Sequence, residues 1–219
     1  MAKGKNNVFF CQECGYESSK WVGQCPACKA WNTMVEEIVD KKSSVTHRQI
    51  TEVQVAKLND VQSSSEKRMD THIEELNRVL GGGIVPGSLV LVGGDPGIGK
   101  STLLLQTCKS LSDQKIAVLY ISGEESLQQI KMRADRIGIF SDEMTLLCES
   151  NLDLIQGVIE ERKPQVVVID SIQTMRCMDI SSSSGTVSQV KESAARLLAV
   201  AKKQEIPMFI VGHVNKDGA

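Results

Sequence analysis

The segment LVGGDPGIGKSTLLL, residues 91–105, constrains the fold more than any other part of the chain. Residues 94–101 match the pattern G-x-x-x-x-G-K-[ST], and they lie between an apolar, strand-like run and a helix-forming run. Glycines in such a turn let backbone N–H groups point inward around phosphate oxygens, and the following helix adds the positive end of its dipole. The segment therefore predicts a phosphate-binding loop (P-loop) for ATP or GTP.

The side chains of this loop have separate expected tasks. Lys100 can reach the β and γ phosphates, and the Ser101 hydroxyl can bind Mg²⁺. The strand and helix on either side argue against a glycine-rich turn without a ligand. The residues expected to contact the nucleotide are Gly94, Asp95, Pro96, Gly97, Ile98, Gly99, Lys100, Ser101 and Thr102.

Strand-like and helix-like segments alternate from residue 69 onward. Apolar runs with few polar residues predict strands that are covered on both faces, and helical crossovers imply a parallel sheet. The sequence therefore predicts a doubly wound α/β domain with its ligands at the carboxyl ends of the strands. Strands are expected at 88–93, 116–122, 144–148, 165–170 and 207–212, and helices at 71–80, 100–112, 126–137, 151–162 and 186–204.

Acidic residues follow two of these strands. Asp170 ends the apolar run VVVID, where a carboxylate can hold Mg²⁺ through water. Glu124 and Glu125 follow the run YIS at the same edge of the sheet. A carboxylate there can activate the attacking water. Alternatively, glutamates at the start of a helix can have the sole effect of stabilising the helix dipole.

Four cysteines near the N-terminus, Cys11, Cys14, Cys25 and Cys28, have the spacing C-x2-C-x10-C-x2-C. Without a secretion signal, this spacing indicates a metal site rather than disulfides. Two such turns supply four thiolates with no open position, so zinc is expected to hold the shape of a small ribbon; a rubredoxin-like iron site is the alternative. Trp21 and Trp31 are expected to pack over the sulfurs. The other three cysteines, Cys108, Cys148 and Cys177, are expected to be buried apolar residues.

Composition divides the chain into a zinc ribbon at 1–34, a polar linker at 35–68 with one short strand in ITEVQV, and the α/β domain at 69–219. The net charge is −2, which provides no electrostatic signal for nucleic acid. No apolar run suggests a membrane span or a signal peptide, so no membrane partner and a cytoplasmic location are expected.

Several motifs occur in the order found in one known family. The zinc motif is followed by RVLGGGIVPGSLVLVGGDPGIGKSTLLLQ, YISGEES, VVIDSIQTM and VGHVNKDG. Together they resemble the RadA (Sms) family of bacterial DNA-repair ATPases, whose core is similar to the RecA and DnaB motors. The resemblance implies a RecA-like core in a homo-hexamer. It also implies an ATP-driven translocase on single-stranded and branched DNA that promotes branch migration together with RecA.

The resemblance also suggests residue roles. It points to Glu124 rather than Glu125 as the catalytic glutamate, beside Lys100 and Asp170. It implies that His213 senses the γ-phosphate, although a polar strand end is the plainer interpretation. It matches the serine-rich segment 176–186 to a mobile, DNA-contacting loop.

Two departures from the family pattern stand out. The family usually carries a glycine near His72 and an aspartate near Asn77. The chain also stops soon after His213, so we expect a truncated core without the second DNA loop or the family's C-terminal domain. On this basis the 219 residues are expected to bind nucleotide, hydrolyse it slowly and translocate poorly.

Other functions use the same loop. A small-molecule kinase would need an acceptor pocket and an arginine-rich lid, which residues 110–219 do not suggest. A KaiC-like, ATP-gated scaffold without translocation is the main alternative. The non-enzymatic alternative is a zinc-ribbon protein whose P-loop serves only as a switch for docking.

Overall fold

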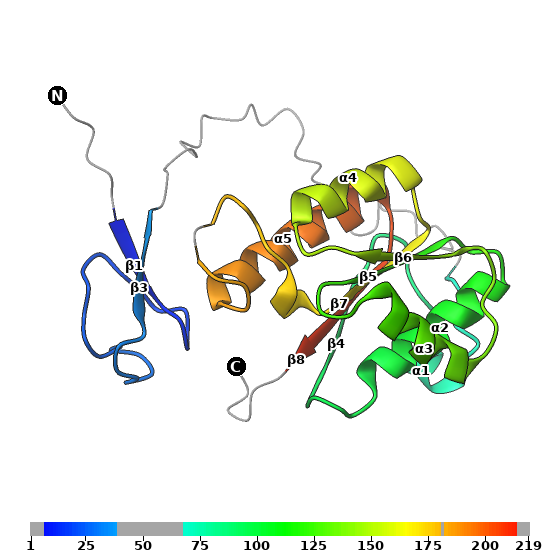
Figure 1. The fold of residues 1–219 in the computed structure, drawn as a ribbon, viewed down its shortest axis with the longest axis horizontal. Coiled ribbons are helices and arrows are strands. Elements are labelled where there is room, and N and C mark those ends of the chain that lie inside the picture. Colours follow the sequence, from blue (N-terminus) through cyan, green and yellow to red (C-terminus); the bar gives the residue numbers. More distant parts are fainter. Residues whose placement is uncertain (1–6, 39–67, 181, 214–219) are drawn as a thin grey trace, which may run out of the picture.

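A computed structural model describes residues 7–38, 68–180 and 182–213. It contains a small antiparallel sheet near the N-terminus and a five-stranded parallel sheet flanked by helices (Figure 1). The short strand expected in ITEVQV lies outside the described residues.

The small sheet consists of β1 (Asn7–Cys11), β2 (Glu17–Ser18) and β3 (Met34–Ile38), in the order β2-β1-β3. The pairing of β1 with β3 runs from Cys11 opposite Met34 to Asn7 opposite Ile38. The ribbon therefore extends four residues beyond the boundary expected at residue 34, because the backbone of β3 completes the ladder along the whole of β1.

The large sheet is parallel and has the strand order β4-β8-β7-β5-β6. Its ends agree with the expected strands to within two residues. The strands are β4 (Leu89–Gly94), β5 (Val118–Ser122), β6 (Met144–Cys148), β7 (Val166–Asp170) and β8 (Met208–His213).

Three of the five α-helices in the described residues begin at polar residues that sequence capping rules favour. Ser126 accepts a hydrogen bond from the Gln129 backbone in a full capping box, and Asn151 and Thr186 cap the two later helices. None of the helices in the described residues is long and apolar enough to cross a membrane. The helices are α1 (Glu74–Val79), α2 (Lys100–Asp113), α3 (Leu127–Ile137), α4 (Leu152–Arg162) and α5 (Val187–Gln204).

Each face of the large sheet is covered by its own pair of helices (Figure 1). On one face, Tyr120 and Val168 of the sheet pack with Leu104 of α2 and its neighbours. On the other face, Ile121 and Ile169 pack with residues of α4 and α5. Because successive strand residues point to opposite faces, this alternation confirms the predicted doubly wound α/β fold.

The first helix starts later than expected, at residue 74 rather than 71. His72 has a φ of 53°, a left-handed conformation in which glycine is favoured over other residues. Asp70 supports this turn by accepting hydrogen bonds from the His72 backbone (2.7 Å) and from the Asn77 side chain (2.6 Å). The two positions of the first departure from the family pattern, His72 and Asn77, thus lie in one hydrogen-bonded turn.

Candidate nucleotide site and metal centre

The P-loop connects the end of β4 to the start of α2. Gly97 (φ 81°) and Gly99 (φ 99°) take conformations that other residues rarely adopt. A Cβ atom at either position would meet no heavy atom within 4 Å. The glycines therefore turn the backbone and leave space along the loop, which fits a phosphate group that approaches the backbone closely.

Lys100, the first residue of α2, is 7% exposed. Its Nζ donates hydrogen bonds to the carbonyl oxygens of Gly94 (2.7 Å) and Asp95 (2.8 Å). An ammonium group has three N–H donors, so the third can bind a phosphate oxygen. Ser101 and Thr102 follow in the first turn of α2, where backbone N–H groups have no partner four residues earlier.

Asp170 ends β7, beside Ser122 at the end of β5. Its Oδ2 accepts a hydrogen bond from the hydroxyl of Tyr120, a fully buried residue of β5. Burial raises the pKa of Tyr120 far above its usual range, and the nearby carboxylate of Asp170 raises it further. Tyr120 therefore keeps its proton and holds the carboxylate at the sheet edge.

The two adjacent glutamates have different surroundings. The Oε1 of Glu124 accepts a hydrogen bond of 2.9 Å from the hydroxyl of Ser171, the residue after Asp170. Glu125 instead forms an ion pair with Arg133 of α3, and its Oε2 is buried without a hydrogen-bond partner in the described residues. Only Glu124 is thus joined to the segment that carries Asp170, while Glu125 points toward α3.

His213 ends β8 and lies opposite Gly94 of β4. Its carbonyl oxygen accepts a hydrogen bond of 3.2 Å from the Nε2 of Gln173. Its Nδ1 is buried and has no hydrogen-bond partner in the described residues. Gln173 was not among the expected site residues, and no spacing in the sequence indicated this contact across 40 positions.

The residues expected to handle nucleotide thus share one edge of the large sheet. Gly94 and His213 are opposite each other on β4 and β8, and Asp170 ends the next strand, β7. The edge combines an ammonium group, a helix N-terminus, a hydroxyl and carboxylates. These groups can bind a phosphate chain, hold a divalent cation and activate a water molecule.

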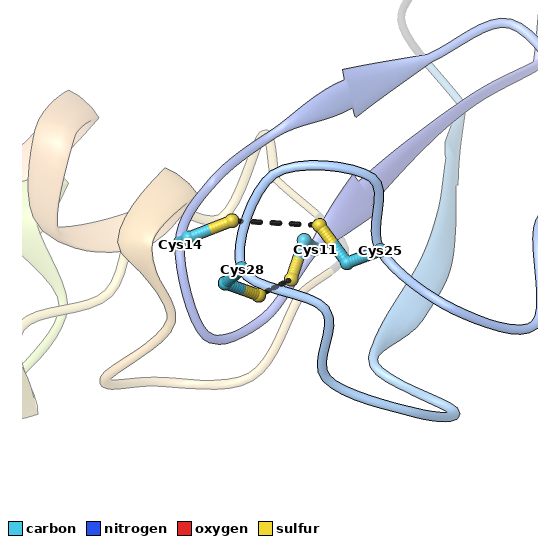
Figure 2. Close-up of side chains that lie close together, drawn as sticks. All are labelled: Cys11, Cys14, Cys25 and Cys28. Carbon is cyan, nitrogen blue, oxygen red and sulfur yellow. Dashed lines mark hydrogen bonds between the residues drawn. The ribbon is translucent and has the colours of Figure 1, made fainter.

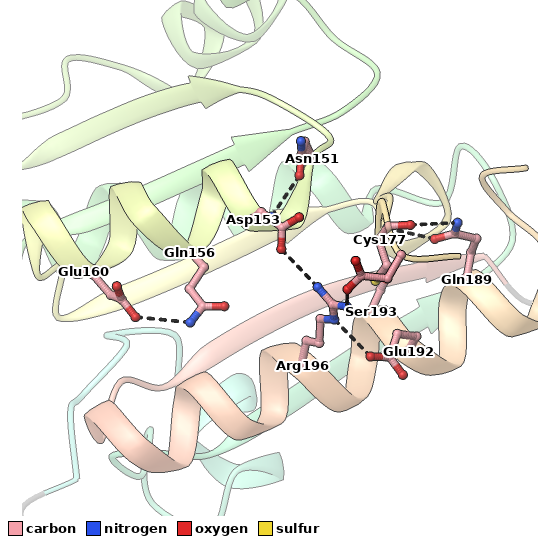
Figure 3. Close-up of polar contacts among 10 residues, drawn as sticks. Asn151, Asp153, Gln156, Glu160, Cys177, Gln189, Glu192, Ser193 and Arg196 are labelled. Atoms are coloured by element: carbon pink, nitrogen blue, oxygen red, sulfur yellow. Dashed lines mark hydrogen bonds and ion pairs between the residues drawn. The ribbon is translucent and has the colours of Figure 1, made fainter. Parts of the chain in front are cut away.

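Described residues of the serine-rich segment 176–186 are hydrogen-bonded to α5 (Figure 3), and the mobility expected of this segment stays a prediction. The buried side chain of Gln189 accepts a hydrogen bond from the Cys177 N–H (2.9 Å) and donates to the carbonyls of Cys177, Ile180 and Ser182. Residue 181 lies outside the described residues. Its neighbours are held because one buried glutamine amide pairs with several backbone groups.

Ion pairs of Arg196, in α5, also connect the serine-rich segment to the helices. Its guanidinium forms ion pairs with Asp153 of α4 (3.0 Å), with Asp179 of the segment (2.5 Å) and with Glu192 of its own helix (3.0 Å). Hydrogen bonds to Glu192 and Asp179 raise the pKa of Arg196 above its usual range. The arginine therefore stays charged and links α4, α5 and the serine-rich segment.

The four N-terminal cysteines converge on one point (Figure 2). Their sulfur atoms all lie within 4.8 Å of one another. The closest pairs, Cys11 with Cys28 and Cys14 with Cys25, are 3.6 Å apart. Sulfurs around a tetrahedral zinc with bonds of about 2.3 Å would be roughly 3.8 Å apart, so the spacing of the four thiols is close to that of the expected metal shell.

Hydrogen bonds favour the ionised form of the Cys11 thiol, which is the form that binds metal. Burial by itself raises the pKa of Cys11, but the Thr33 hydroxyl and two backbone N–H groups lower it to about 6. Met34, Phe9 and Val22 pack against the buried cysteines.

Two expectations about side chains near the cysteines or the core were wrong. Trp21 and Trp31 are 57% and 69% exposed rather than packed over the sulfurs, because smaller side chains already fill that space. Cys148 is exposed, since it ends the edge strand β6, whereas Cys108 and Cys177 are buried as expected.

Comparison with known proteins identifies the large domain. A family model described as "AAA domain" matches residues 54–219. The chain belongs to the AAA domain family. A model described as "Rubredoxin metal binding domain" also matches residues 9–36, which contain the four cysteines and precede the AAA domain.

Relatives of this AAA domain protein are named "DNA repair protein RadA". Those of Bacillus subtilis (strain 168) and Halalkalibacterium halodurans are 52% and 53% identical to it over 224 and 223 residues. That of Streptococcus pyogenes serotype M1 is 50% identical over 220 residues. The matches cover 100% of this chain and 49%, 49% and 48% of the relatives. The resemblance expected from the motifs is confirmed, and the chain spans about half the length of these relatives.

Proposed function

We propose that this chain carries the nucleotide site of a DNA-dependent ATPase in DNA repair. The observation that carries the proposal is the hydrogen bond between Glu124 and Ser171, which places a carboxylate next to Asp170 on the P-loop edge of the sheet. A P-loop alone can serve a switch or a scaffold. A second carboxylate at that edge gives the site a group that can take a proton from water.

Each group has a task in this mechanism. Lys100 and the N-terminus of α2 bind the phosphates, and Ser101 and Asp170 hold Mg²⁺, which neutralises charge on the β and γ phosphates when bound. Glu124 orients the attacking water and accepts its proton. His213, at the end of the neighbouring strand, contacts the γ-phosphate and reports its presence.

The relatives' name supports action on DNA. We infer that the serine-rich segment 176–186 contacts single-stranded or branched DNA, and that the protein works as a homo-hexameric translocase promoting branch migration with RecA in the cytoplasm. The ribbon at residues 7–38 binds zinc through four cysteines and has a structural task, since such a shell has no open position for water.

The test is ATP turnover with and without single-stranded DNA. It compares this chain with a form extended to the length of its relatives. The proposal expects both to bind ATP, the extended form to turn over faster, and DNA to raise that rate. Turnover in the extended form that is insensitive to DNA favours the KaiC-like scaffold instead. Rapid DNA-stimulated turnover by the 219 residues alone would contradict the expected slow rate.

A further inference from the structure

Contacts of both its backbone and its side chain fix the position of Glu125. Its N–H donates a 3.0 Å hydrogen bond to the Oγ of Ser122, and its carbonyl oxygen accepts one of 3.1 Å from the Sγ of Cys148. Its Oε1 pairs with the guanidinium of Arg133, in the middle of α3. The ion pair therefore determines the direction of the side chain, which points toward α3.

This ion pair is largely buried, and the carboxylate depends on it. The side chains of Arg133 and Glu125 are 25% and 29% exposed. The Oε2 of Glu125 is buried and has no hydrogen-bond partner in the described residues. A buried charge that loses its partner is strongly disfavoured. Without Arg133, the carboxylate would have to bind a proton or turn toward water or another cation.

The nearest place for another cation is the candidate magnesium site. The N–H groups of Glu124 and Glu125 both donate to the Oγ of Ser122, so the two glutamates leave one tight turn. Glu124 points to Ser171, the residue after Asp170. Because Mg²⁺ attracts carboxylate oxygens, a Glu125 side chain released from α3 would compete with Glu124 and Asp170 at the sheet edge.

The two members of the ion pair behave differently when each is left alone. Arginine has a long apolar stem, and its charged head can reach water while the stem stays packed. Glutamate is shorter, and one oxygen of Glu125 is already buried. Loss of Glu125 should therefore be tolerated, whereas loss of Arg133 leaves a carboxylate without its partner.

We propose that Arg133 is a positioning residue for ATP hydrolysis, because it holds the Glu125 carboxylate against α3 and leaves the magnesium site to Glu124 and Asp170. This inference rests on the proposed function, since it requires that Glu124 acts on water beside Mg²⁺. It differs from a purely structural ion pair, in which the loss of either partner would have the same effect.

The test compares Arg133→Met, Glu125→Gln and the double variant in single-turnover ATP hydrolysis with excess Mg²⁺. Arg133→Met is expected to hydrolyse ATP about 10- to 100-fold more slowly, as misplaced groups at a reacting centre commonly do. Its affinity for a slowly hydrolysed ATP analogue should stay close to that of the wild type. Glu125→Gln should keep most of the rate, and the double variant should regain most of it, because the competing carboxylate is gone. Equal losses in the two single variants, or a double variant as slow as Arg133→Met, would overturn the proposal.

Urea unfolding of the same variants gives a second result that does not depend on hydrolysis. Arg133→Met should unfold at a lower urea concentration than Glu125→Gln, and the double variant should recover part of the difference. If Arg133→Met fails to fold, Arg133→Gln carries both measurements. A Glu125→Gln variant that is less stable than the Arg133 variant would contradict the proposal.

The matched control is Lys131→Met, which removes an exposed ion pair with Asp135 on the same helix. It is expected to hydrolyse ATP and to unfold like the wild type. Failure of the proposed function is distinguishable. No ATP hydrolysis by the wild type would contradict the proposed function and this inference together, whereas hydrolysis that Arg133→Met leaves unchanged would contradict this inference alone.

Discussion

The hydroxyl of Tyr120 donates a hydrogen bond to the Oδ2 of Asp170, and this bond joins two neighbouring strands just below the candidate magnesium site. Tyr120 is fully buried, whereas Asp170 lies at the edge of the sheet. A group that fixes the plane of a carboxylate also sets how well that carboxylate holds a cation.

Tyr120→Phe should therefore raise the Mg²⁺ concentration needed for half-maximal ATP turnover. Loss of such a supporting hydrogen bond commonly lowers metal affinity by about 10- to 100-fold. Turnover should recover at high Mg²⁺, because the ring remains to fill the core. Tyr16→Phe, at a 39% exposed tyrosine of the ribbon, is the control. An unchanged Mg²⁺ requirement in Tyr120→Phe would show that Asp170 does not depend on this bond.

Glu124→Gln and Glu125→Gln should have unequal effects. Removing a general base typically lowers turnover by about 10²- to 10⁴-fold, so Glu124→Gln should bind ATP and hardly hydrolyse it. Glu125→Gln breaks the ion pair with Arg133 and should retain most of the turnover. Rates measured in parallel on the two variants decide the assignment, and the reverse order would move the catalytic role to Glu125.

Two glycine substitutions should change stability in opposite directions. Gly123→Ala forces a methyl group against Thr174 and should lower the free energy of unfolding by about 1–3 kcal/mol. Gly157→Ala, inside α4 with no atom within 4 Å, should raise it by about 0.5–1 kcal/mol. Urea denaturation of both variants measures this. Equal stability of the two variants would mean that Thr174, in the short 3-10 helix Ile172–Thr174, does not pack closely against Gly123 after β5.

Zinc binding by the ribbon should strengthen as the pH rises. The metal binds thiolates. A backbone hydrogen bond with Ala30 lowers the pKa of Cys28, but burial and the neighbouring thiols outweigh it and raise that pKa to about 12. Burial is the main cause that raises the pKa of Cys14. These two thiols are protonated in the metal-free ribbon at neutral pH, whereas Cys11, with a pKa of about 6, is mostly ionised above that pH. Uptake therefore releases at least two protons.

The affinity for zinc should accordingly rise by roughly 100-fold per pH unit between pH 6.5 and 7.5. A competition titration with a chelator of known proton uptake measures the slope. Metal analysis of the same material separates zinc from iron. A slope near zero would mean that the four thiols are already ionised without metal.

The local sequence pattern was sufficient to predict the strands and most of the helices of the large domain. Runs such as VVVID and VLYIS are apolar on both faces, and polar caps such as Ser126 mark helix starts, so the element ends were predicted to within two residues except at the start of α1. The P-loop lies where the motif places it because the turn needs glycines at fixed positions.

Contacts between distant residues were not predictable from pattern. Tyr120 meets Asp170 across 50 positions, and Ser171 meets Glu124 across 47. A tyrosine in an otherwise aliphatic strand was the one available signal, because a buried hydroxyl needs a partner. The hydrogen bonds between the serine-rich segment and α5 were equally unpredictable, because they come from a single buried glutamine, Gln189.

The most direct test of the nucleotide site is a titration of the 219-residue chain with ATP and Mg²⁺, alone and as Lys100→Ala. Wild type should bind, and Lys100→Ala should bind about 30-fold or more weakly, because losing a charged partner of a phosphate costs roughly 2 kcal/mol or more. Lys109→Ala, which loses only a surface ion pair with Asp113 on the same helix, should bind like wild type. Failure of the folded wild-type chain to bind ATP in excess Mg²⁺ would contradict the assignment of the site.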